Sequence, residues 1–199
     1  MKELLYNQLK EIKDDGIRNF VKTALDNAPE GFWTIACSGS GRYHPPENQG
    51  SGGVIRHLIK CIITAKDLCD YFNLDEKDTD IVLAGAILHD IQKNGIPWGE
   101  KTHIEHAKIG ADFLKKFELK EPEKTEIINC VRYHMHRFTG TIEDRERASN
   151  PTIKEHIIQM TDMFCSRKFA SWLPWLELTN EQINNFSSNI NPNMDPKLI

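Results

Sequence analysis

The stretch ILHDIQKNG, residues 87–95, carries more information about this protein than any other part of the sequence. It follows an apolar run, DIVLAGAIL (80–88), and places His89 and Asp90 side by side. An imidazole and a carboxylate in this arrangement suit a hard or borderline metal ion. Burying both groups costs on the order of several kcal/mol unless they are paired or bound to a metal. The pair therefore predicts a polar site at the end of a core helix.

Four more metal-capable residues lie in or beside helical apolar patterns elsewhere in the chain. They are His57, His106, His134 and Asp162. Along the chain, each of these candidates is separated by 16 to 32 residues from the next candidate or from the His89-Asp90 pair. These separations are too long for a local motif. They can meet only in a folded helical bundle, whose core can hold ligands from facing helices. Each histidine taken alone is better explained as an ordinary core or surface residue than as a metal ligand.

The composition is that of an ordinary globular protein. The chain has 199 residues, enough for one domain with a sizeable core, and is 39% hydrophobic and 27% charged. Its net charge of −4 gives no broad attraction to a phosphate backbone. Nucleic acid is therefore not an expected partner.

The sequence also argues against a membrane or secreted protein. No apolar run approaches the roughly 18–20 residues that a membrane helix needs, and residues 1–15 carry four acidic side chains and resemble no secretory signal. The five cysteines are scattered, odd in number and form no CxxC pair, so we expect buried, reduced thiols. These features predict a cytoplasmic protein.

The N-terminal region is predicted to form helices followed by a long loop. Residues 3–27 read as one or two amphipathic helices with a break at Asp15-Gly16. Their apolar stripe consists of Leu4, Leu5, Leu9 and Ile12. Residues 28–53 are rich in Gly, Pro, Ser and Asn, and a loop of this length is more often functional than idle.

The rest of the chain is predicted to be all-α. We expect helices over 54–73, 77–92, 102–118, 121–137 and 152–169, and a flexible polar tail over 186–199. Thr102 with Glu105 forms a capping-box pattern, and Pro122 suits a first helical turn. Strand signals are weak, with room only for a turn or short strand near 30–45.

Five segments, in order, resemble the HD superfamily of metal-dependent phosphohydrolases, in the branch that holds two metal ions. They are GGVIRHLIKC (52–61), LAGAILHDIQK (83–93), EHAKIGADFL (105–114), VRYHMH (131–136) and EHIIQMTDMF (155–164). The resemblance covers about residues 50–168. It implies a single HD domain over 1–199, with a helical-bundle core at about 50–170, an N-terminal helical extension, and a long loop before the first ligand helix.

The resemblance also implies a set of metal ligands. The first ion would be held by His57, His89, Asp90 and Asp162. Asp90 would bridge to a second ion, which His106 and His134 would complete.

Two other histidines compete with this set, because His103 and His136 lie three and two residues from predicted ligands. We expect both at the surface or on the substrate side. His44 and His156 have no metal argument.

Lys93 follows Asp90 by three residues. The resemblance implies that it binds a substrate phosphate, and the alternative is a solvated lysine at a helix C-terminus. Arg42, Arg56 and Arg137 are weaker candidates for substrate phosphate.

The resemblance implies two divalent metal ions, with iron or manganese favoured and zinc, nickel, cobalt or magnesium compatible, and a site with a single ion is the alternative. Asp90 and Lys93 would be catalytic residues. The expected reaction is hydrolysis of a phosphate ester or anhydride in a small nucleotide or dinucleotide by a metal-activated hydroxide. The nearest resemblance is to bacterial HD hydrolases of the diadenosine tetraphosphate type, although the loop over 30–53 differs. Neither a G-x-S-x-G motif nor a P-loop is present.

Two other functions stay open at this point. Some HD-fold proteins use the same six ligands to hold two irons and activate oxygen, so a diiron oxygenase acting on a small organic substrate is the main alternative. A regulatory module with an inactive site is disfavoured, because such modules usually lose ligands and this chain has all six.

Overall fold

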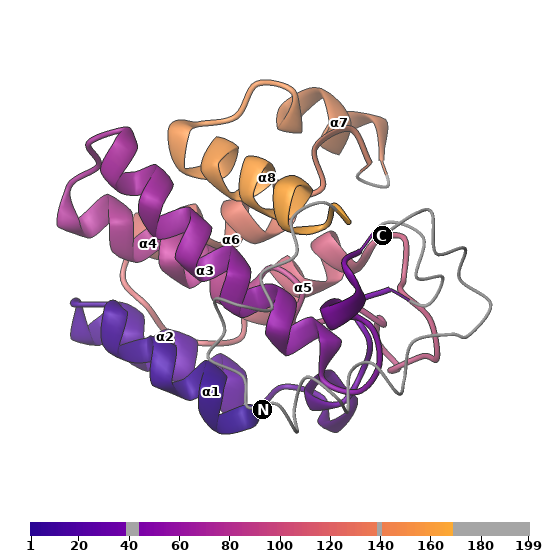
Figure 1. The fold of residues 1–199 in the computed structure, drawn as a ribbon. Helices are drawn as coiled ribbons and strands as arrows, with labels where there is room; N and C mark the ends of the chain where they lie inside the picture. Colours follow the sequence, from indigo (N-terminus) through magenta and orange to yellow (C-terminus); the bar gives the residue numbers. More distant parts are fainter. Residues whose placement is uncertain (39–43, 139–140, 169–199) are drawn as a thin grey trace.

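A computed structural model describes residues 1–38, 44–138 and 141–168, and within them every regular element is a helix (Figure 1). The all-α prediction is therefore confirmed. The elements are α1 (Lys2–Tyr6), η1 (Asn7–Glu11), α2 (Asp15–Asp26), η2 (Glu30–Trp33), η3 (Pro46–Asn48), α3 (Gly53–Tyr71), α4 (Glu76–Leu88), α5 (His106–Leu114), α6 (Glu123–Tyr133), η4 (His136–Phe138), α7 (Ile142–Ala148) and α8 (Ile153–Cys165).

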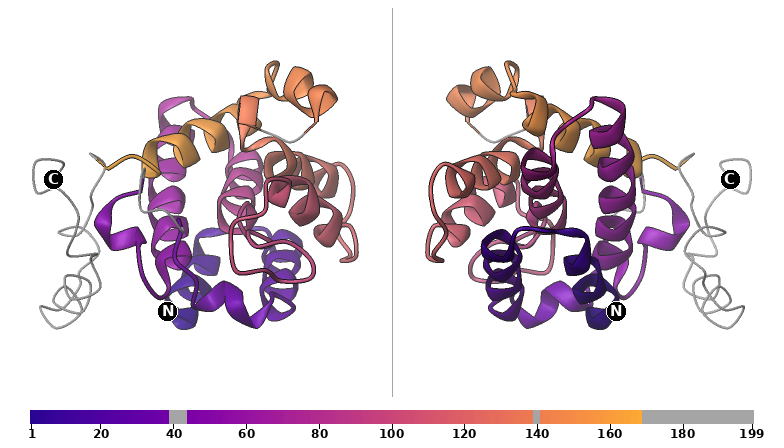
Figure 2. Two further views of the ribbon diagram at one scale, coloured as in Figure 1. Left: turned by 90° about the vertical axis from the view of Figure 1, so that its right-hand side faces the viewer. Right: turned by 90° about the vertical axis from the view of Figure 1, so that its left-hand side faces the viewer.

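Helix α4 is the centre of the bundle. It packs against α2, α3, α6 and α8, and α5 joins through α6. Figures 1 and 2 show α1 and α2 on one side of the α3–α4 pair and α7 and α8 on the other. Every residue of α4 from Asp80 to Leu88 is buried, as expected for a helix that is apolar all round. The end of α4, where the His89-Asp90 pair follows, therefore lies inside the protein.

A glycine lets α4 approach α6 closely. A Cβ added at Gly85 would stand 2.8 Å from the Cβ of Cys130, closer than real Cβ atoms approach. Because the two helices cross here, the residues that follow their C-terminal ends, His89 and His134, are brought toward each other.

The break between the N-terminal helices lies at a different position from the predicted one. The chain leaves helical geometry at Ile12, and Asp14 caps α2 by accepting a hydrogen bond from the Ile17 amide, so Asp15-Gly16 begins a helix and does not break one. The buried carboxylate of Asp80 accepts hydrogen bonds from the backbone amides of Lys13 and Asp14 at 2.7–3.0 Å. This contact with α4 fixes the break.

The predicted stripe of the N-terminal segment holds at three of its four positions. Leu5, Leu9 and Ile12 are buried, whereas Leu4 is 40% exposed.

The predicted capping box at Thr102 is wrong. Helix α5 begins at His106, and its N-cap, Glu105, makes no side-chain capping bond. The Glu105 amide instead donates to Nδ1 of His103, whose own amide donates to the Lys93 carbonyl at 2.8 Å. These bonds hold residues 93–105 as a loop, and α4 correspondingly ends at Leu88 and not at 92.

The remaining helix ends lie within a few residues of their predicted positions, with three further differences. A capping box does exist at the start of α8, between Thr152 and Glu155. Pro122 is the N-cap of α6 and not its first helical residue, and the short helix α7 was not predicted.

The predicted long loop contains η2 and η3 and is anchored to α3. The guanidinium of Arg56 is 3% exposed and donates to the carbonyls of Glu47, Gln49 and Ser51. Its place in this network corrects the expectation that Arg56 binds substrate phosphate, because its donors already bind backbone oxygens. Lys60 and Glu47 form a fully buried ion pair at 2.5 Å.

Two general expectations are met in the described residues. All five cysteines are buried and free. In the part of the chain described here, no helix has both the length and the apolar character needed to cross a membrane.

We predict that Lys60→Met destabilises the protein by about 3–5 kcal/mol, because it removes the cation that compensates the buried charge of Glu47. Lys66 is a matched control on the same helix. It is about half exposed and pairs with Glu11 at 2.5 Å, so Lys66→Met should cost less than about 1 kcal/mol. Urea unfolding of both variants measures the difference, and equal losses would contradict the assignment of the buried pair.

Candidate metal centre

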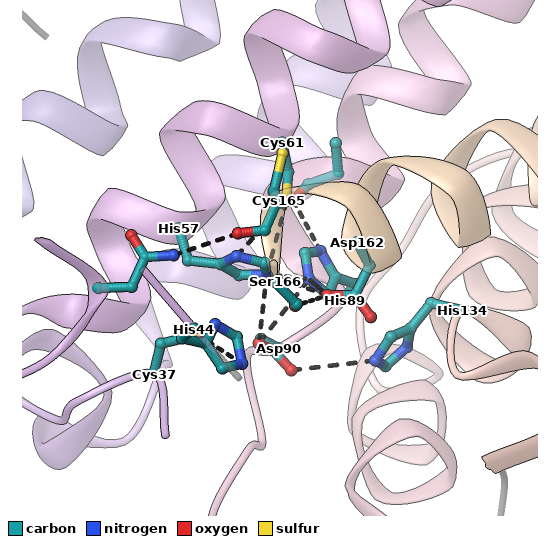
Figure 3. Close-up of polar contacts among 12 residues, drawn as sticks. Cys37, His44, His57, Cys61, His89, Asp90, His134, Asp162, Cys165 and Ser166 are labelled. Carbon is teal, nitrogen blue, oxygen red and sulfur yellow. Dashed lines mark hydrogen bonds and ion pairs between the residues drawn. The ribbon is translucent and has the colours of Figure 1, made fainter. Parts of the chain in front are cut away.

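Three of the predicted ligands converge from three helices (Figure 3). His57 comes from α3, His89 follows α4 and Asp162 comes from α8. Nε2 of His57 lies 3.3 Å from Nε2 of His89 and 3.1 Å from Oδ1 of Asp162. Nε2 of His89 lies 3.7 Å from the same Asp162 oxygen. These atoms form the first donor group.

A second donor group lies beside the first. His106 begins α5 and His134 follows α6, and their Nε2 atoms are 3.2 Å apart. Asp90 completes this group, since its Oδ1 lies 3.2 Å from Nε2 of His106 and 3.9 Å from Nε2 of His134.

Asp90 is shared by the two groups. Its second oxygen, Oδ2, lies 3.7 Å from Nε2 of His89 and 4.0 Å from Nε2 of His57. The side chain is 1% exposed, and among the described residues Oδ1 has no hydrogen-bond partner. A buried carboxylate oxygen that faces two imidazole nitrogens and lacks a hydrogen bond suits a metal ligand, because an ion would compensate its charge.

The spacing of the donors also fits metal ions. Two nitrogens that each lie about 2.0–2.1 Å from an ion are about 3.3 Å apart in tetrahedral geometry. The nitrogen pairs of the two groups, at 3.3 and 3.2 Å, match this value. The residues present therefore fit divalent ions at both groups.

The imidazoles are oriented by backbone carbonyls. Nδ1 of His89 lies 3.0 Å from the Ala86 oxygen, and Nδ1 of His134 lies 2.7 Å from the Val131 oxygen. In a third pair, Nδ1 of His106 lies 2.8 Å from the His103 oxygen. A ring that donates its Nδ1–H to a carbonyl keeps the Nε2 lone pair free, which is the usual arrangement of metal-binding histidines. In all three, that lone pair is directed into the donor groups.

Burial and charge hold the donors in their ligating forms. Burial lowers the pKa of His89, and it lowers that of His134 to about 3, so both rings are neutral at pH 7. Burial alone would raise the pKa of Asp90, but Lys93 and the nearby imidazoles outweigh it and hold that pKa well below its usual range. The pKa of Asp162 is also held below its usual range. Burial alone would raise it, but the hydrogen bond with His57 and the nearby imidazoles outweigh that effect.

Lys93 belongs to the same cluster. Its Nζ lies 2.6 Å from Oδ2 of Asp90, and the residue is 7% exposed. Burial favours the neutral amine, but the Asp90 charge prevails and raises the pKa of Lys93 above its usual value. The alternative of a solvated lysine at a helix end is therefore wrong, since Lys93 is a buried cation beside the shared carboxylate.

The other predicted residues lie away from the two groups or outside the described residues. His103, His136 and His156 are exposed. Arg137 is exposed on η4, with its guanidinium 5.1 Å from the centre of the Phe138 ring, and its substrate role stays a prediction. Arg42 lies outside the described residues.

Sequence reasoning missed two side chains at the edge of the first donor group. The rings of His44 and His57 are 5.3 Å apart in an edge-to-face arrangement, and Nε2 of His44 lies 3.8 Å from Sγ of Cys37. Burial lowers the pKa of His44 to about 3. The one signal available was that both residues occur in the polar loop just before the first ligand helix.

Thiols also flank His57. Sγ of Cys61, one turn along α3, lies 3.5 Å from its Nε2, and Cys165 lies beside Cys61 in Figure 3. The sequence showed buried cysteines but gave no sign of this proximity.

Comparison with known proteins gives one match. A family model for the HD domain matches residues 54–166, which include all six predicted ligands and more than half of the chain. No curated protein and no solved structure matches the chain significantly. The order of the ligand segments, the all-helical fold and this match agree, and the chain belongs to the HD domain family.

Proposed function

We propose that this protein is a metal-dependent phosphohydrolase that cleaves a phosphate ester or anhydride of a small nucleotide or dinucleotide. The observation that carries the proposal is the Asp90 carboxylate, whose two oxygens face two separate histidine groups. The HD domain family, whose members are mostly metal-dependent phosphohydrolases, supports the same reaction class.

Six side chains would hold the metal ions. His57, His89 and Asp162 would bind one, His106 and His134 the other, and Asp90 would bridge them. When bound, two divalent ions supply a hydroxide at neutral pH and offset the charge that develops on the phosphate. The mixed nitrogen and oxygen donors suit iron or manganese, and also zinc, nickel or cobalt.

Lys93 would bind the substrate phosphate. An ammonium group has three N–H donors, and Asp90 uses one of them, so two can reach phosphate oxygens. A charged donor held in a buried site stabilises developing negative charge far better than one in water. Asp90 orients the ammonium group and keeps it protonated.

The nucleotide part of the proposal rests on η4. This helix begins two residues after His134 and exposes Phe138, which is 57% accessible, next to the Arg137 guanidinium. An exposed aromatic ring and an arginine suit a base and a further phosphate, respectively.

Substitution of the shared carboxylate tests the proposed site. Asp90→Asn should lower phosphate release by more than about 100-fold, beyond the 10–100-fold typical of losing an outer partner of a metal site. Metal-loaded protein would be screened against nucleoside mono-, di- and triphosphates, dinucleoside polyphosphates and cyclic nucleotides. Asp112→Asn is the control, because this exposed carboxylate pairs with two lysines at the protein surface, Lys108 and Lys115.

Two outcomes would count against this assignment. Full activity in a folded Asp90→Asn variant would show that the site lies elsewhere. Bound iron with oxygen consumption on an organic substrate, and no phosphate release, would favour the diiron oxygenase.

The two donor groups should be separable. His106→Ala and Asp162→Ala each remove one ligand from a different group, so each should lower the metal content from about two ions per chain to about one. Elemental analysis after dialysis measures this. Wild-type metal content in both variants would contradict the two-group assignment.

Lys93→Met should separate substrate binding from metal binding. We expect metal content to be retained while phosphate hydrolysis falls about 100- to 1,000-fold, as on loss of an electrostatic donor. Lys108→Met serves as the control, because this side chain is 44% exposed and pairs with Asp112. Unchanged turnover in Lys93→Met would leave this lysine with a purely structural role.

A further inference from the structure

His44 reaches the metal centre from the loop that precedes α3. Its ring lies against that of His57, and Cys37, His44 and His57 each offer a ligand-type atom within 4.8 Å of the others (Figure 3). None of the six proposed ligands comes from this loop. His44 is therefore an additional polar group beside the first donor group.

The position of His44 is built into the fold. The chain before and after it is tied together, since the Cys37 amide donates to the Asn48 carbonyl at 2.9 Å. A Cβ at Gly53 would collide with that same carbonyl, so the start of α3 must be glycine for the loop to lie this close. The buried Glu47–Lys60 pair then fixes the loop to α3.

One nitrogen of the His44 ring lacks a hydrogen-bond partner among the described residues. This atom, Nδ1, is buried. Leaving a buried polar atom unpaired costs about 1–3 kcal/mol, so such an atom in a native structure calls for an explanation. A partner that arrives with the substrate would supply the missing bond.

The other ring nitrogen indicates which tautomer is present. Nε2 lies 3.8 Å from Sγ of Cys37, and burial raises the pKa of that thiol, which therefore keeps its proton. If the thiol donates to Nε2, the ring carries its own hydrogen on Nδ1. The unpaired atom is then a donor, and an oxygen acceptor matches it.

We propose that His44 is a substrate-binding residue that donates a hydrogen bond from Nδ1 to a phosphoryl oxygen of the substrate at the metal centre. The proposal rests on the phosphohydrolase function above and adds to it a contact from the loop of residues 44–50. His44 and Lys93 would then bind the phosphoryl group through a neutral and a charged donor.

Two variants test the donor. His44→Asn keeps an N–H group near the position of Nδ1, whereas His44→Leu has similar bulk and no donor. In Mn²⁺-loaded protein, titration calorimetry would measure the affinity for inorganic phosphate. We expect His44→Leu to weaken binding about 10- to 100-fold, as for a hydrogen bond to a charged group, and His44→Asn to stay within about threefold of wild type. His156→Leu, at an exposed position on α8, is the control.

Manganese content distinguishes this role from direct metal ligation. Both His44 variants should bind as much manganese as the wild type, and thermal unfolding should show that both are folded. Loss of manganese would make His44 a metal ligand and overturn the proposal. Equal phosphate affinity in wild type, Asn and Leu variants would overturn it while leaving the proposed function intact. A wild-type protein that binds manganese but no phosphate would overturn both.

Discussion

The burial of one carboxylate between two pairs of imidazoles is the constraint on which the rest of this structure depends. Asp90 is almost inaccessible, ionised, and placed so that each oxygen faces a different histidine group. Such a charge is stable inside a protein only when several groups compensate it. Lys93 supplies one compensating charge, and the donor groups are arranged so that metal ions would supply the rest.

The bundle meets this constraint by placing polar residues at helix ends. His89 and His134 follow the last residues of α4 and α6, and His106 opens α5. Backbone carbonyls near these ends accept hydrogen bonds from the rings and orient them. The apolar sides of the same helices form the core, so the fold and the site use different parts of each helix.

The loop before α3 is held to that helix by buried polar contacts. Arg56 and Lys60 lie on the helix that carries His57, yet neither faces the donor groups as a substrate ligand. They bind the backbone and the carboxylate of the loop instead. Their buried bonds hold His44 beside His57, which links a polar, glycine-rich segment to the metal centre. Loop position and site geometry are thus set by the same helix.

The sequence by itself determined the all-helical class, the family and the six candidate ligands, because apolar periodicity and ordered local motifs are properties of short segments. Its predictions were wrong where contacts outside a regular helix decide the structure. Thr102 does not cap a helix, because bonds made by His103 hold that segment as a loop, and Arg56 binds carbonyls of the segment around η3, which no helical pattern reveals. Only the tertiary structure decided which Asp90 oxygen faces which pair of histidines, that Lys93 is buried, and that His44 borders the centre. Each of these depends on contacts between separate segments of the chain, and sequence spacing does not specify such contacts.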